Sequence, residues 1–71
     1  MRGRELRRIL EREPLNYVAT RQTGSHVTLD SLRWPALHLA FHDADTIPPG
    51  LVRKILMRDV GLSEEEARGL L

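Results

Sequence analysis

Two short runs of alternating residues constrain the fold more than any other feature of this sequence. In residues 26–30 and 37–42, every second side chain is apolar. These alternating apolar residues are Val27, Leu29, Leu37, Leu39 and Phe41. Because successive side chains of a β-strand point to opposite faces, each run predicts a strand with one buried and one wet face. Residues 16–22, which include Tyr17, Val18 and Thr20, predict a further strand.

Helical patterns flank the strands. Residues 3–13 place Leu6, Ile9 and Leu10 on one face of a helix that ends before Pro14. Pro48-Pro49-Gly50 predicts the start of a second helix. Its expected buried residues are Leu51, Val52, Ile55, Leu56 and Val60. Gly61 predicts the C-cap of that helix. Ser63 and Glu66 have the spacing of a capping box, which predicts a short last helix. Leu70 and Leu71 at its end are expected to contact the core or a partner.

The element order α-β-β-β-α-α predicts an α+β fold with a three-stranded antiparallel sheet and the helices on its apolar face. With 71 residues, the chain is expected to form a single domain over residues 1–71 with no room for a deep cofactor cavity. It has no cysteine for a disulfide or a thiolate zinc site, so help from a partner chain is plausible. No apolar run reaches the length of a membrane span, and we expect a cytoplasmic protein without membrane contact.

The formal charge of +1 hides an uneven distribution along the chain. Residues 1–33 carry seven arginines against four acidic side chains, whereas the last eleven residues carry one arginine against three glutamates. Arg4, Arg8 and Arg12 form an i, i+4, i+8 stripe on the first helix that suits an RNA backbone. An ordinary solvated face, with glutamates as i, i+3 and i, i+4 partners, explains the stripe equally well. The same two interpretations apply to Arg53 and Lys54.

Strand parity predicts that all three histidines, His26, His38 and His42, lie on the open face of the sheet. They are either ordinary polar residues at the solvent-facing positions of the strands or residues that take part in binding or catalysis. A metal site is disfavoured, because the chain offers no cysteine, no histidine pair on a helix and no neighbouring carboxylate cluster to complete a ligand set. Histidine has an unperturbed pKa of about 6.5 and so can take and give a proton near neutrality.

That property suits the cleavage of RNA, where the ribose 2′-hydroxyl is itself the nucleophile. His26 is then a candidate acid or base, with the Gly24 and Ser25 backbone and the Ser25 hydroxyl as phosphate donors beside it. A serine hydrolase is a poorer interpretation, because Ser25 has no G-x-S-x-G setting.

Several ordered features resemble the HicA-type mRNA interferase toxins of bacterial toxin–antitoxin systems. They are the opening helix from Gly3-Arg4-Glu5-Leu6 to Leu10, the turn Gly24-Ser25-His26, the histidine at His42, the segment from Pro49-Gly50-Leu51 to Leu56, and the ending Gly61-Leu62-Ser63-Glu64-Glu65. The resemblance implies a fold like that of double-stranded-RNA-binding domains and ribosome-independent cleavage of mRNA, with His26 as the catalytic residue. Because the RNA supplies its own nucleophile, we expect no cofactor and no metal. It also implies inhibition by a HicB-type antitoxin protein in a toxin–antitoxin complex.

Other residues have secondary roles in this interpretation. His42 is expected to hold phosphate or to orient His26, and Ser25 to assist. The family usually carries a lysine after the histidine that corresponds to His42, whereas this chain has Asp43-Ala44-Asp45 there. This difference predicts weaker and more salt-sensitive phosphate binding. Trp34 is expected to stack on a base, to cover the core edge or to dock the antitoxin. The alternative function is a non-catalytic RNA-binding or antitoxin-docking module of the same fold.

Overall fold

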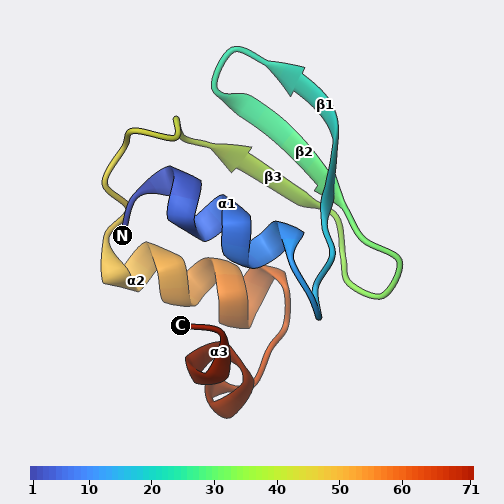
Figure 1. Cartoon of the computed structure of the whole chain (residues 1–71), viewed down its shortest axis with the longest axis vertical. Coiled ribbons are helices and arrows are strands. Elements are labelled where there is room, and N and C mark those ends of the chain that lie inside the picture. Colours follow the sequence, from blue (N-terminus) through green and yellow to red (C-terminus); the bar gives the residue numbers. More distant parts are fainter.

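Three antiparallel strands form a single sheet in the order β1-β2-β3 (Figure 1). They are β1 (Val18–Thr23), β2 (His26–Asp30) and β3 (Leu37–Ala40) in a computed structural model that describes residues 1–71. This confirms the predicted antiparallel meander. The strand after the long connection ends at Ala40, two residues before the predicted end at position 42, because the chain turns there toward the first helix.

The helices lie on one side of the sheet (Figure 1). They are α1 (Gly3–Glu11), α2 (Pro49–Arg53), η1 (Lys54–Asp59) and α3 (Glu64–Leu70). The first helix stops two residues short of its predicted end. The predicted second helix continues from α2 into a π-helical stretch, η1, which ends with the Val60 N–H donating to the Ile55 carbonyl at 2.9 Å. A side-chain periodicity does not distinguish this i→i−5 pattern from an α-helix. No helix combines the length and the hydrophobicity that crossing a lipid bilayer requires.

One core joins the apolar face of the sheet to the helices. Val27, Leu29, Leu37 and Leu39 are buried as the alternation predicts, and Phe41 is half-buried. The core also contains Leu6, Ile9, Leu10, Leu15, Tyr17, Ile47, Val52, Ile55, Leu56, Val60, Leu62 and Ala67. Leu51 was predicted to be buried but is 37% exposed, because Val52, Ile55 and Leu56 already cover this part of the core and Leu51 lies at their solvent edge.

Two aromatic residues close the end of the core near the long connection. Tyr17 is buried, and its hydroxyl donates to the Pro35 carbonyl at 2.7 Å. The removal of the phenol from water raises the pKa of Tyr17 above its ordinary value. Trp34 is half-buried and packs against the same core, with its indole N–H shielded from solvent. Of the three predicted positions for Trp34, the structure places it at the core edge.

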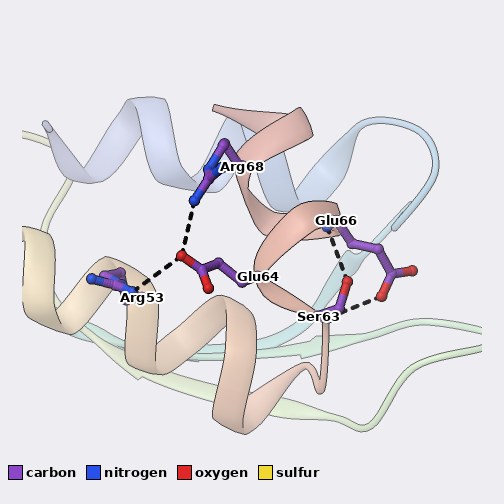
Figure 2. Close-up of polar contacts among 5 residues, drawn as sticks. All are labelled: Arg53, Ser63, Glu64, Glu66 and Arg68. Atoms are coloured by element: carbon purple, nitrogen blue, oxygen red, sulfur yellow. Dashed lines mark hydrogen bonds and ion pairs between the residues drawn. The ribbon is translucent and has the colours of Figure 1, made fainter.

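The last helix has the predicted capping box (Figure 2). The Ser63 hydroxyl accepts from the Glu66 N–H at 3.1 Å, and the Glu66 carboxylate accepts from the Ser63 N–H at 2.9 Å. The Ser63 backbone N–H, and to a smaller degree the Ser63 side chain, stabilises the ionised Glu66 carboxylate and so lowers the pKa of Glu66. Arg12, just beyond the end of α1, donates to the Leu70 carbonyl at 2.7 Å and so links α1 to α3. Leu70 is half-buried, whereas Leu71 is 63% exposed.

Candidate active site

A tight hairpin turn places His26 at the first position of β2. Thr23 pairs with His26 across a two-residue loop, Gly24-Ser25. Gly24 has a φ of +61°, the sign that a type II′ turn requires at its first central residue, and glycine reaches that region without strain. The sequence Gly-Ser-His therefore has a local structural reason, because the glycine makes the turn that starts β2 at the histidine.

The side chain of His26 lies on the open face of the sheet. His26 pairs with Thr23 on one side and with Ala40 on the other, and it is exposed. No hydrogen bond or ion pair within the protein engages its imidazole. His38 shares this face, but its Nδ1 and the Thr28 hydroxyl lie 3.3 Å apart in a hydrogen bond. His26 therefore has the freer imidazole of the two.

His42 departs from the prediction that all three histidines share the open face. It lies two residues beyond the end of β3, in a turn where its N–H donates to the Asp45 carboxylate at 2.8 Å. Together with Ser25, it lines a cleft of about 240 Å³ that we call the hairpin cleft. The residues with polar groups along this cleft are Arg7, Gln22, Gly24, Ser25, His42 and Asp43. The structure thus brings His42, Ser25 and Gly24 together, with His26 at the adjoining strand position.

A second cleft begins where the hairpin cleft ends. This helix cleft, of about 490 Å³, is lined by Arg4, Arg7, Arg8, Glu11, Asp43 and Ala44. Three arginines face two carboxylates here, and Arg7 and Asp43 belong to both clefts. Arg4 and Arg8 therefore lie beside Arg7 and Asp43, the two residues that join the helix cleft to the hairpin cleft.

Arg7 was not singled out from the sequence. Its side chain is only 20% exposed, its Nη2 lies 3.0 Å from the Glu11 carboxylate, and its Nε is shielded from solvent without a hydrogen-bond partner. The sequence did contain a signal for this position. Arg7 follows Gly3 by four residues and precedes Leu10 by three, so it lies on the edge of the buried face of α1.

The remaining predicted RNA contacts are elsewhere. The Arg12 guanidinium donates to the Leu70 carbonyl. Of the three arginines in the predicted stripe, only Arg4 and Arg8 therefore have guanidinium groups without such a bond. Arg53 Nη2 lies 3.9 Å from the Glu64 carboxylate, which also accepts from Arg68 Nη2 at 2.9 Å (Figure 2). Arg53 and Lys54 are exposed, and neither lines the two clefts. No group of three or more histidine, aspartate or glutamate side chains is arranged to hold a metal ion.

A comparison with protein-family models matches residues 3–62 to the family described as the HicA toxin of bacterial toxin–antitoxin systems. The matched range contains α1, the whole sheet, both clefts, α2 and η1, and it leaves α3 outside. Comparisons with curated proteins and with solved structures give no match.

Proposed function

The chain belongs to the family of HicA toxins of bacterial toxin–antitoxin systems, and on this premise we propose that it is an endoribonuclease that cleaves mRNA through His26. The observation that carries the proposal is the exposed, unengaged imidazole of His26 on the open sheet face, directly after the Gly24-Ser25 turn. Histidine suits this reaction because it exchanges a proton near neutral pH.

The proposed reaction is an internal transfer of the phosphodiester. The His26 imidazole takes the proton of the ribose 2′-hydroxyl, and the 2′-oxygen forms a bond to phosphorus while the bond from phosphorus to the 5′-oxygen breaks. The protonated His26 imidazole gives this proton to the departing 5′-oxygen, which leaves one fragment with a 2′,3′-cyclic phosphate and the other with a 5′-hydroxyl. The substrate supplies its own nucleophile, so one positioned imidazole replaces a larger catalytic apparatus.

The other site residues hold the RNA in this proposal. Gly24, Ser25 and His42 offer donors to a phosphate in the hairpin cleft. Arg4 and Arg8 bind the backbone along the helix cleft, while Arg12, Arg53 and Lys54 are more distant contacts. An antitoxin protein of the HicB type is the proposed partner that restrains the activity, and the cytoplasm, where mRNA is present, is the proposed location.

The experiment compares the purified chain with His26→Ala and His38→Ala on total RNA in the presence of EDTA. His38 is a matched control because it is an exposed histidine on the same face, engaged only with Thr28. We expect the wild type and His38→Ala to cleave, and His26→Ala to lose about 10²–10⁴-fold in rate, the usual contribution of a general acid or base. Equal rates for all three proteins, or cleavage only after a divalent metal is added, would contradict the proposal.

A second candidate function is RNA binding without cleavage. It is favoured by Arg4, Arg7 and Arg8 in the helix cleft, which lie on the side of the sheet away from His26 and can bind a phosphate backbone whether or not His26 acts. A gel shift with a single-stranded RNA separates the two functions. Retained binding with no cleavage by the wild type would favour the binding module.

A further inference from the structure

A β-bulge in β1 changes which face of the sheet its side chains point to. Ala19 pairs with Leu29, but Arg21 pairs with Thr28, so that Thr20 is an extra residue with no partner of its own. Without the bulge, Ala19 and Arg21 would lie on the same face, because side chains alternate along a strand. With it, Ala19 lies on the face of buried Leu29, and Arg21 lies on the open face.

The neighbours of Arg21 confirm this assignment. Gln22, the next residue, pairs with buried Val27 and lines the hairpin cleft on the helix side of the sheet. Thr23 pairs with His26 on the open face. Arg21 therefore stands diagonally across from His26, at a separation of about 7–8 Å between the backbones, which a long side chain spans.

The bulge is held by a side chain and not only by the backbone. The Thr20 hydroxyl donates to the Asp30 carboxylate at 2.7 Å and lies 3.4 Å from the Thr28 carbonyl. These contacts fix the extra residue against the neighbouring strand. They also engage Asp30, which is the carboxylate of β2 on the open face, with a hydroxyl rather than with Arg21.

Arg21 is left with a free charge beside His26. It is the sole lysine or arginine in the three strands, it is exposed, and it takes part in none of the ion pairs of the protein. The arginines of α1 are on the other side of the sheet, and Ser25 lines the hairpin cleft there. Arg21 is thus the cation that the fold places on the same face as the His26 imidazole.

We propose that Arg21 is a catalytic residue, which rests on the proposed ribonuclease function. As the 2′-oxygen bonds to phosphorus and the 5′-oxygen departs, negative charge builds on the two non-bridging oxygens. The guanidinium of Arg21 donates two N–H groups to these oxygens, in the fork geometry that matches a phosphate. His26 moves the protons, Arg21 stabilises the charge, and Thr20 is a positioning residue that holds Arg21 on this face.

The first test measures kcat and KM for Arg21→Gln and Arg21→Lys on a short single-stranded RNA. Loss of a donor to a developing oxyanion lowers kcat by about 10²–10³-fold, and we expect this for Arg21→Gln with a much smaller change in KM. Arg21→Lys retains the charge without the fork and is expected to fall between Arg21→Gln and the wild type. The control is Arg68→Gln on α3, which also removes one positive charge and is expected to leave kcat unchanged.

The second test addresses the bulge. Thr20→Val keeps the shape of the side chain but removes the hydroxyl that bonds Asp30, and we expect kcat to fall at least several-fold while Thr20→Ser retains the wild-type rate. A kcat for Arg21→Gln equal to the wild type would overturn the role of Arg21 and leave the proposed ribonuclease function intact. No cleavage by the wild type would overturn both proposals. Equal kcat for Thr20→Val and Thr20→Ser would overturn the positioning role of Thr20.

Discussion

Gly3 offers a sharp test of how the first helix meets the loop after β3. The residue is buried at the start of α1, and a Cβ atom added to it would lie 2.3 Å from the His42 carbonyl oxygen and 2.8 Å from Cδ1 of Phe41. The closer neighbour is a backbone atom, which cannot rotate away as a side chain does. Gly3→Ala therefore forces α1 and the loop apart, by more than half an ångström.

The cost of Gly3→Ala follows from the contacts that hold the two segments together. The Gly3 N–H donates to the Asp45 carbonyl at 2.8 Å, and the Arg4 N–H donates to the Asp43 carbonyl at 3.0 Å. Each hydrogen bond contributes about 0.5–1.5 kcal/mol, and overpacking of a tight site costs about 1–3 kcal/mol. The better helix propensity of alanine returns at most about 1 kcal/mol. With both hydrogen bonds lost, we expect a net decrease of about 1–5 kcal/mol in the free energy of unfolding.

The measurement is urea denaturation followed by circular dichroism, with Gly69→Ala as the control. Gly69 lies within α3, and no atom lies within 4 Å of a Cβ added there. Gly69→Ala is expected to keep or raise stability by up to about 1 kcal/mol, whereas Gly3→Ala should lower it and, in a thermal melt, reduce the melting temperature by about 4–8 °C for each kcal/mol lost. If Gly3→Ala were as stable as Gly69→Ala, the close docking of α1 on the loop that carries His42 would be refuted.

Three further predictions concern pH, capping and charge. Burial raises the pKa of Tyr17, so its contribution to stability is complete below pH 10.0, the ordinary value for tyrosine, and is lost as the pH rises through the raised pKa. Tyr17→Phe should remove this alkaline decline in urea titrations and cost about 1 kcal/mol at neutral pH, because the bond to Pro35 is lost. Ser63→Ala should cost about 1 kcal/mol of stability, and in an NMR titration it should raise the pKa of Glu66 toward its ordinary value; an unchanged pKa would contradict the capping box. Asp43→Lys should tighten RNA binding and steepen its dependence on salt by roughly 0.7 in the log–log slope per added phosphate contact; an unchanged slope in fluorescence anisotropy would place Asp43 away from the RNA.

Much of the fold could be predicted because it depends on local periodicity. The alternation in β2 and β3 fixed which residues face the core, and it placed His26 and His38 on the open face before any register was known. Helix starts and ends followed from similarly local signals, such as the Ser63 capping box and Gly61, whose φ of +95° suits glycine. Each of these features is decided by a few neighbouring residues.

The missed features depend on contacts between distant segments. The N-terminal residues pair with the loop before α2, where Arg2 forms a bridge with Thr46 and its guanidinium donates to the Ala44 carbonyl at 2.9 Å. No pattern in either segment indicates this pairing, and the pairing carries His42 away from the open face. The bulge at Thr20 is equally hidden, because the side-chain hydrogen bond at the bulge is to Asp30, ten residues later in the chain.

The residues of the proposed ribonuclease site are divided between two faces of the sheet, and this division has a consequence for the proposed mechanism. The open face holds His26 and Arg21 without an enclosing wall. Water therefore screens the charges on this face. The positions of the imidazole and the guanidinium are set by the strand backbone and not by burial. The clefts on the helix side hold the larger number of arginines, together with Asp43 and Glu11. Substitutions on the open face should therefore act mainly on kcat, whereas substitutions in the clefts should act mainly on RNA affinity and its dependence on salt. In this proposal, an RNA strand has to pass over the Gly24-Ser25 turn to engage both faces at once, since this turn is where the two faces meet.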